Sequence, residues 1–237
     1  MAEIIGKIHS LQSLGAVDGP GLRFLVFMQG CPLRCVYCHN PDTWAFEGGM
    51  EMNADTLLKK ILRYKPYFKN GGGVTVSGGE PLMQPDFIAE LFRLLKENGI
   101  HTALDTSCSV TGEKAEMVLQ YTDMVLADLK FATEHEYQKY CKGRLQRVED
   151  FLRKTEEMKI PLWVRHVIVP VINDCVEDMW RIREKAEKYS NLEKIEWLPY
   201  HNLCVEKYES MKIPFPLRDT PNLSKERLQE LIDGIYA

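Results

Sequence analysis

The chain has 237 residues, of which 45% are hydrophobic and 27% are charged, ordinary values for a globular protein with a sizeable core. Its net charge of −4 gives no electrostatic reason to expect nucleic acid or an anionic membrane as a partner. We expect no secretion signal, because the opening residues MAEIIGKIHS are too polar, and no apolar run is long enough to span a bilayer. Seven cysteines, three of them crowded together, argue against a secreted disulfide scaffold and favour the reducing cytoplasm.

Strand-like and helix-like segments alternate along the chain from residue 23 onward. The expected strands are short apolar runs that cover residues 23–29, 74–77, 101–107, 123–130, 161–170 and 194–200. The expected helices have apolar residues at helical spacing and cover residues 54–64, 85–99, 113–121, 147–158, 176–189 and 224–235. Six strand-then-helix cycles predict an α/β fold with parallel strands, either an open doubly wound sheet or a barrel, whole or partial. No Pro-, Gly- or Ser-rich linker divides the chain, so we expect one domain over residues 1–237.

A cluster of three cysteines follows the first expected strand. The stretch GCPLRCVYCHNP contains Cys31, Cys35 and Cys38 in the pattern C-x3-C-x2-C, and thiolates are soft metal ligands. A structural zinc ion needs four ligands, and a cubane iron–sulfur cluster has four irons that each need one. Three cysteines would leave one iron open, which suits catalysis. A zinc site that adds His39 is the alternative on ligand count, although His39 directly follows Cys38 and would strain to bind the same ion.

The other chemically conspicuous residues fall at or near the carboxyl ends of the expected strands. They are Gly78, Gly79, Glu80, Asp105, Thr106, Asp128, Lys130, Arg165 and His201. Parallel α/β sheets and barrels assemble their sites at that edge, so this convergence predicts a single active site. Four further cysteines, at positions 108, 141, 175 and 204, have no mutual ligand spacing and are expected to be ordinary small residues.

Three features among these residues carry a specific physical argument: Arg165, the Asp128 and Lys130 pair, and the glycines of SGGEP. Arg165 lies inside an apolar strand, and an unpaired buried guanidinium is costly, so it should face an anion of the protein or of a ligand. Asp128 and Lys130 are two residues apart, which places both side chains on one face of a strand. They are either a salt-bridged pair or ligand-binding groups. The glycines of SGGEP permit a close approach to the chain, but the same pattern also occurs in plain turns.

Taken together, the motifs resemble those of the radical S-adenosylmethionine (radical SAM) enzymes. The runs VDGPGLRF, FMQGCPLRCVYCHNPDTW, GGGVTVSGGEP, LDTS, DLK and LPYH are similar in order and spacing to those of glycyl-radical-enzyme activating enzymes, over essentially the whole chain. Many such enzymes carry a cysteine-rich, ferredoxin-like insert, whereas residues 39–79 of this chain contain no cysteine. The resemblance therefore favours the group that acts on pyruvate formate-lyase. Activating enzymes of anaerobic ribonucleotide reductases also lack the insert but are typically smaller.

The resemblance implies a partial (β/α)6 barrel with a [4Fe-4S] cluster on Cys31, Cys35 and Cys38. The amino and carboxylate groups of S-adenosylmethionine (SAM) would bind the fourth iron, and Gly78, Gly79 and Glu80 would meet the ammonium group. The complete set of residues implied near SAM is Tyr37, Cys38, His39, Gly78, Gly79, Glu80, Asp105, Asp128, Leu129, Lys130, Arg165 and His201. The family also binds a monovalent cation at positions that correspond to Asp105, Thr106 and Asp128, with Leu126 as the backbone contributor.

The implied activity is that of an anaerobic oxidoreductase. A flavodoxin or ferredoxin would reduce the cluster, SAM would be cleaved to methionine and a 5′-deoxyadenosyl radical, and the radical would remove hydrogen from a glycine of pyruvate formate-lyase. No catalytic residue is expected outside the cluster and the SAM site. We expect a monomer with no nucleic-acid or membrane partner. The alternatives are the activating enzyme of another glycyl radical enzyme, a radical SAM enzyme with a small-molecule substrate, and a non-catalytic zinc-stabilised interaction module.

Overall fold

The computed structural model describes residues 4–237, and its central feature is one eight-stranded sheet. The strands are β1 (Ile5–Gly15), β2 (Arg23–Met28), β3 (Met50–Asn53), β4 (Gly73–Gly78), β5 (His101–Thr106), β6 (Met124–Asp128), β7 (Leu162–Ile168) and β8 (Leu192–Pro199). The helices are α1 (Ala54–Leu62), α2 (Pro85–Glu97), α3 (Glu113–Leu119), α4 (Glu134–Glu136), α5 (Leu145–Glu157), α6 (Val176–Ala186), α7 (Val205–Ser210) and α8 (Lys225–Tyr236). A π-helical turn, Tyr137–Cys141, continues α4. No helix among these residues is long and apolar enough to cross a bilayer.

The order of the strands decides between the two architectures that the sequence left open. The sheet runs β3-β1-β2-β4-β5-β6-β7-β8, and the six strands from β2 to β8 are parallel neighbours in chain order. A doubly wound sheet reverses its strand order at a switch point, and this sheet does not. The sheet does not close on itself, since β8 pairs only with β7. The prediction of a partial (β/α)6 barrel is confirmed.

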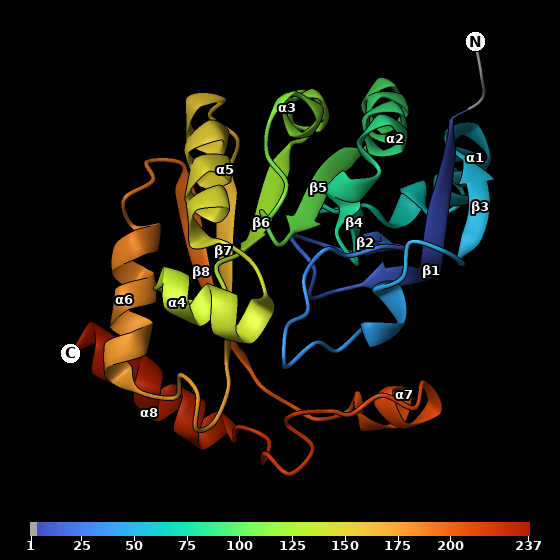
Figure 1. The fold of residues 1–237 in the computed structure, drawn as a ribbon. Helices are drawn as coiled ribbons and strands as arrows, with labels where there is room; N and C mark the ends of the chain where they lie inside the picture. Colours follow the sequence, from blue (N-terminus) through green and yellow to red (C-terminus); the bar gives the residue numbers. More distant parts are fainter. Residues whose placement is uncertain (1–3) are drawn as a thin grey trace.

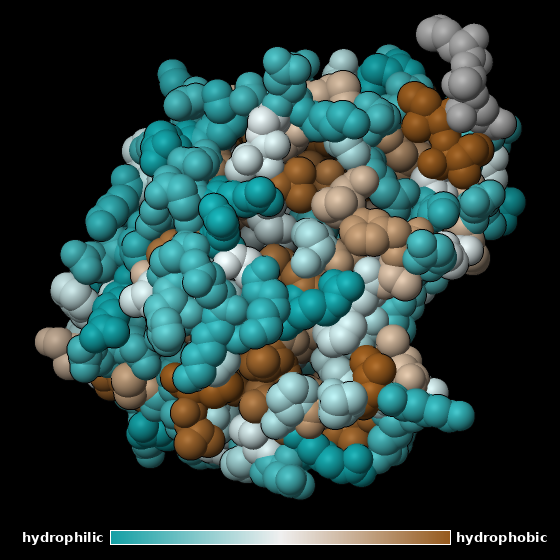
Figure 2. Space-filling view, viewed as in Figure 1, coloured by the Kyte–Doolittle hydropathy of each residue, from teal (hydrophilic) through white to brown (hydrophobic). Residues whose placement is uncertain are grey.

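Helices α2, α3, α5 and α6 lie along one side of the curved sheet, whereas α7 lies apart from it (Figure 1). In α2, the residues Phe87, Ile88, Leu91 and Leu95 are buried, as the helical spacing predicts, and Pro85 occupies the first turn. The outward sides of α2, α5 and α6 are hydrophilic in Figure 2, which is the expected complement of buried apolar stripes. The apolar faces of these helices therefore pack against the sheet, and their polar faces lie at the surface.

Four elements were not predicted from the sequence. Strands β1 and β3 add two antiparallel members to the edge of the sheet, beside β2. Both mix polar and apolar residues, and few of their side chains are buried, so the alternation that marks a half-buried strand is weak. Helices α4 and α7 have three and six residues, too few for a periodic pattern to be visible.

The connection between β1 and β2 folds onto the inner, concave face of the sheet. Arg23, fully buried, donates hydrogen bonds to the carbonyl oxygens of Pro20, Gly71 and Val74. Burial lowers the pKa of Arg23 to about 10. Thr75 Oγ1 donates to the carbonyl of Asp18 over 2.6 Å. These bonds fix the connection so that Asp18 reaches the interior of the partial barrel.

Candidate active site

A cavity of about 300 Å³ opens at the carboxyl end of the parallel strands, within the range of small-molecule sites. Every parallel strand, or the loop that follows it, contributes to its wall. The residues predicted for the site that line it are Cys31, Cys35, Tyr37, Cys38, His39, Gly78, Gly79, Asp105, Thr106, Asp128, Lys130 and Arg165. Glu80, Leu129 and His201 were predicted with them and do not line the cavity. The ends of the parallel strands therefore converge on one cavity, which is the candidate for the predicted site.

The three clustered cysteines share this cavity, and none of the four others lines it. Burial raises the pKa of Cys31 to about 12, with a further contribution from Glu80, and raises that of Cys38 to about 11. Iron binding replaces such protons, because the thiolate is the ligand. Three soft donors on one cavity fit a cubane cluster with one iron left open. The zinc alternative requires at least three such ligands around one ion. Among residues 4–237, no three His, Cys, Asp or Glu side chains are close enough together to bind a single metal ion.

Gly78 and Gly79 bring the end of β4 against the start of the cysteine loop. Gly79 N donates to the carbonyl of Met28 over 2.9 Å, and Glu80 N donates to the carbonyl of Gly30 over 2.8 Å. A Cβ on Gly79 would lie 2.2 Å from Gly30 O, and Gly78 has φ of +104°. The glycines therefore permit two backbone segments to touch. That contact places the residue before Cys31 beside the strand edge.

The Glu80 side chain is fully buried behind the cavity wall. Its carboxylate accepts hydrogen bonds from Thr106 Oγ1 at 2.8 Å, from Ser107 N at 2.9 Å and from Leu82 N at 3.1 Å. Burial raises the pKa of Glu80, and these hydrogen bonds oppose the shift. The carboxylate thus joins the end of β4 to the end of β5, where Thr106 and Ser107 face the cavity.

Glu80→Ala is expected to lower the free energy of unfolding by about 2–4 kcal/mol, because several buried donors lose their acceptor. Urea unfolding followed by circular dichroism measures this. Glu90, which pairs with Arg93 on the surface of α2, provides the control, and Glu90→Ala should cost less than about 1 kcal/mol. Equal losses in the two variants would show that Glu80 does not brace the site.

Arg165 projects from β7 into a group of carboxylates. Its Nη1 lies 3.3 Å from Asp105 Oδ2 and 3.7 Å from Asp18 Oδ1, and its Nε lies 3.4 Å from Glu196 Oε2. The expectation that this buried guanidinium faces an anion is confirmed, and the anions belong to the protein. Burial raises the pKa of Asp105 to about 6, an effect that Arg165 opposes. Ser77 Oγ also donates to Asp105 Oδ2, over 2.6 Å.

Asp128 and Lys130 form a pair at the end of β6. Lys130 Nζ lies 2.7 Å from Asp128 Oδ2, so the two side chains share one face as their spacing predicted. Burial lowers the pKa of Lys130, but Asp128 together with Cys35, Tyr37 and Cys141 more than offsets this, so the pKa lies well above its ordinary value. Leu129, between them, points away into the core, and its carbonyl faces Nδ1 of His166 at 2.7 Å. The strand end thus presents one fixed cation and one fixed anion to the cavity.

Aromatic residues close the side of the cavity near the third cysteine. His39 lines it and stacks on His201 with ring centroids 4.1 Å apart, so His201 supports His39 from behind. Burial and, to a smaller extent, the neighbouring His201 lower the pKa of His39 to about 4, so the ring is neutral at pH 7. The buried hydroxyl of Tyr37 has no hydrogen-bond partner among the described residues. It is an unsatisfied polar atom on the wall, as expected where a ligand supplies the partner.

Several wall residues were not predicted. They are Asp18, Phe27, Leu33, Asn40, Thr43, Trp44, Ser77, Ser107, Val167 and Leu198. Asp18 belongs to the run VDGPGLRF, which was noticed only as a family motif. The available signal was an acidic residue beside two glycines and a proline. These residues are typical of a tight turn, in which the carboxylate can point toward a site.

The sequence comparisons agree with this site. A sequence model of the radical SAM superfamily matches residues 25–186. A relative from Clostridium pasteurianum is 47% identical over 230 residues, 96% of each chain, and one from Staphylococcus epidermidis is 43% identical over 233 residues, 95% of this chain and 93% of the relative. Both relatives are named pyruvate formate-lyase-activating enzyme. The chain belongs to the radical SAM superfamily and, within it, to the family of these activating enzymes.

Solved structures support the fold. A radical SAM methyltransferase from Sphaerobacter thermophilus matches with a TM-score of 0.64 and 10% identity over 98% of this chain and 74% of its own. SuiB from Streptococcus suis, bound to S-adenosylmethionine, matches with a TM-score of 0.62 and 18% identity over 86% of this chain and 44% of its own. A domain of a pyruvate-formate lyase-activating enzyme from Bacteroides vulgatus matches with a TM-score of 0.56 and 24% identity over 70% of this chain and 94% of its own.

Proposed function

We propose that this chain is an oxidoreductase that activates pyruvate formate-lyase by generating a glycyl radical on it. The observation that carries the proposal is the set of three cysteines on one cavity, in a chain 47% identical to a pyruvate formate-lyase-activating enzyme over 96% of both lengths. When bound, a [4Fe-4S] cluster supplies the electron that cleaves SAM to methionine and a 5′-deoxyadenosyl radical, which takes hydrogen from the target glycine. The protein binds, orients and shields these reactants.

Cys31, Cys35 and Cys38 are proposed to hold the cluster, and the opposite wall to hold SAM. Three aspartates line the cavity, Asp18, Asp105 and Asp128, against the two cations Lys130 and Arg165. With His39 neutral, three negative charges and two positive charges leave a net charge of −1 on the wall. SAM carries a sulfonium, an ammonium and a carboxylate, a net charge of +1. This charge complementarity supports SAM as the ligand of the cavity.

The finer assignments follow from the positions of the polar groups. Gly78 and Gly79 are proposed to face the methionine ammonium across the edge of β4, with Glu80 stiffening that edge rather than touching the ligand. Tyr37 and His39 are proposed to lie near the adenine, with His201 behind His39. Asp128, Lys130 and Arg165 are proposed to hold the ribose and carboxylate. Support for the roles of Lys130, Arg165 and His39 is that a charged or stacked neighbour already fixes each of these side chains, so little ordering is needed when the ligand binds.

A monovalent cation beside SAM is proposed at Asp105, Thr106 and Asp128. Support comes from the two carboxylates, which lie at the ends of neighbouring strands and line the same cavity. Alkali cations favour oxygen ligands of this kind. Asp105 Oδ2 and Asp128 Oδ2 already have partners in Arg165 and Lys130, so the cation would use the remaining oxygens and the Leu126 backbone.

The setting of the reaction is proposed from the sequence. A cytoplasmic flavodoxin or ferredoxin is proposed as the reductant, and a single-domain monomer as the active form. Free cysteines throughout the described chain suit a reducing compartment. The negative net charge gives no support for a nucleic-acid or anionic-membrane partner.

An activation assay tests the proposal. The anaerobically reconstituted chain, with SAM, reductant and pyruvate formate-lyase, is expected to give the doublet of a glycyl radical in electron paramagnetic resonance (EPR) and one 5′-deoxyadenosine for each radical. The control is pyruvate formate-lyase with its target glycine changed to alanine, which should give no doublet. If SAM is cleaved but no doublet forms with the intact partner, the substrate is another glycyl radical enzyme or a small molecule. If no 5′-deoxyadenosine forms at all, the radical SAM assignment fails.

A further inference from the structure

The chain crosses the open side of the partial barrel near its C-terminus. Residues 200–217, here called the C-terminal clasp, follow β8, the last strand of the sheet, and contain α7. The cysteine loop, residues 30–41, follows β2, five strands away in the sheet order. Figure 1 shows α7 beneath the loop that follows β2, separated from the helices that cover the sheet. The clasp therefore joins the two sides of the opening at the edge where the cavity lies.

Tyr208 makes the most direct contact between the clasp and the cysteine loop. Its side chain is 1% exposed, and its hydroxyl donates a hydrogen bond to the carbonyl oxygen of Cys38 over 3.0 Å. The ring packs edge-on against Trp44, with centroids 6.0 Å apart, and stacks on Phe215 at 4.5 Å. A buried tyrosine held by two aromatic neighbours is a rigid donor. The hydrogen bond restrains the peptide group between Cys38 and His39.

Lys207, the neighbour of Tyr208, binds the next part of the loop. Its Nζ lies 2.9 Å from Asn40 Oδ1 and 3.1 Å from Asp42 Oδ2. Asp42 in turn pairs with His9 of β1, at 3.1 Å. The two consecutive clasp residues thus hold the segment that runs from Cys38 to Asp42.

The other half of the loop is held by a different part of the chain. Arg34 N donates to the carbonyl of Cys141, and Val36 N donates to that of Tyr140, each over 2.9 Å. These two bonds flank Cys35 and come from the π-helical turn. Cys35 and Cys38 therefore depend on separate supports, and removal of one support leaves the other in place.

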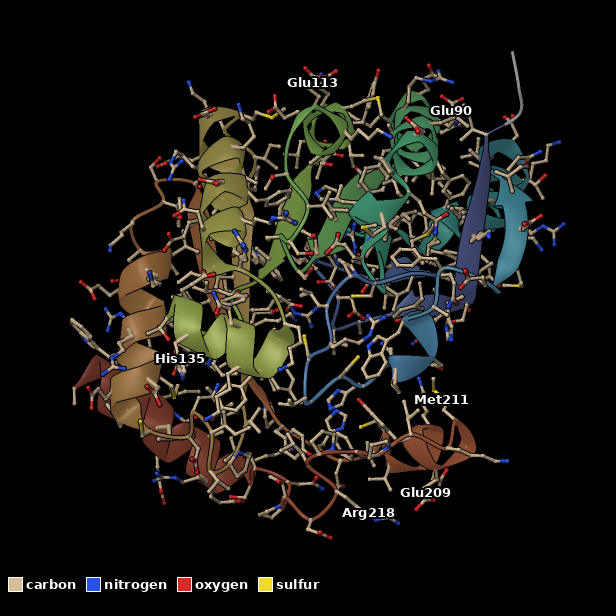
Figure 3. The ribbon with its side chains drawn as sticks, viewed as in Figure 1. Glu90, Glu113, His135, Glu209, Met211 and Arg218 are labelled. Carbon is tan, nitrogen blue, oxygen red and sulfur yellow. The ribbon has the colours of Figure 1, made fainter. Side chains whose placement is uncertain are left out.

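We propose that Tyr208 and Lys207 are positioning residues for the cluster, because Tyr208 holds the backbone of its third ligand, Cys38, and Lys207 holds the side chains of Asn40 and Asp42 just after it. The inference rests on the proposed function only in that Cys38 binds iron. A hydrogen bond to the carbonyl of a ligand residue restrains the peptide plane, and with it the direction of the thiolate and of His39. Without this bond, Cys38 has more freedom to leave its iron. On the outward side, Glu209 of the clasp pairs with Arg218, which follows the clasp, and both lie at the lower edge of the molecule in Figure 3.

The test uses the full chain with its cluster reconstituted. Tyr208→Phe removes one hydroxyl and keeps the aromatic packing. Tyr200→Phe is the matched control, because Tyr200 is also buried in the clasp and its hydroxyl donates to the carbonyl of Leu217. Its ring lies 6.3 Å from that of His39, and phenylalanine keeps this contact. Iron release to a chelator, followed by the loss of visible absorbance, should be about three- to tenfold faster for Tyr208→Phe than for Tyr200→Phe. The EPR spectrum of the reduced cluster with SAM should also change in Tyr208→Phe alone, while the melting temperatures of the two variants stay equal.

The possible outcomes separate the two proposals. Equal rates of iron release and unchanged spectra in the two tyrosine variants would overturn the positioning role. A wild-type chain that binds no cluster would overturn the proposed function instead. If Tyr208→Phe does not fold, Lys207→Met decides the question, because the Lys207 side chain is 40% exposed and its removal should spare the fold. Faster iron release in Lys207→Met supports the positioning role, and an unchanged rate contradicts it.

Discussion

Replacing any one of Cys31, Cys35 or Cys38 with alanine is expected to abolish production of 5′-deoxyadenosine and of the glycyl radical. A cubane cluster with one open iron has no spare protein ligand, so the loss of a thiolate leaves a second iron without a donor. Iron content and visible absorbance of the purified anaerobic variants measure cluster assembly, and product analysis measures turnover. Both should fall to background.

Cys175 provides the matched control for these variants. It is an exposed free cysteine at the start of α6 and does not line the cavity. Cys175→Ala should therefore keep the iron content and the activity of the unaltered chain. Full activity after the loss of Cys31, Cys35 or Cys38 would remove that residue from the ligand set.

Arg165→Ala is expected to lower the free energy of unfolding by about 3–5 kcal/mol, since it leaves a group of buried carboxylates without their cation. Asp105, Asp18 and Glu196 all lie within 4 Å of the guanidinium, which is 12% exposed. The same change should weaken SAM binding, because the wall loses the cation proposed to hold the ligand carboxylate, and the aspartates around it lose their fixed geometry. Urea unfolding and equilibrium SAM binding measure the two effects.

A surface arginine separates burial from charge in this experiment. Arg93 on α2 also pairs with two carboxylates, Glu90 and Glu97, but it is 36% exposed. Arg93→Ala should cost less than about 1 kcal/mol, because solvent screens exposed pairs. Arg165→Lys should fall between wild type and Arg165→Ala, since it keeps the charge and loses the planar fork. Similar losses for Arg93→Ala and Arg165→Ala would show that burial of the carboxylate group is not what makes Arg165 important.

The parallel core of the fold could be predicted because its strands are short apolar runs and its helices are amphipathic. Periodicity does not fix strand order, so the choice between a doubly wound sheet and a partial barrel needed the structure. The same limit applies to the edge strand β3 and to its neighbour β1, whose mixed sequence, IGKIHSLQSLG, has only three buried residues. Local patterns report burial on one face, and an edge strand has little of it.

Some residues of the candidate site could be predicted from the sequence, and others could not. Residues at strand ends could be placed together because parallel strands end at one edge, and Asp128, Lys130 and Arg165 did meet there. Glu80 could not be placed correctly, because its role depends on donors that β5 supplies in space. Tyr208 carries no local signal, since its partner Cys38 lies 170 positions earlier. Contacts of that range depend on the tertiary fold and leave no periodic trace in the sequence.

The distance along the chain between Tyr208 and Cys38 also fixes an order of events during synthesis. The cysteine loop is made early, among the first forty residues, but the hydrogen bond from Tyr208 cannot form until at least 208 residues have been translated. A loop closure of this length is a slow, late step of folding. The cysteine loop of a nascent chain therefore reaches its final shape only after nearly the whole polypeptide has been made.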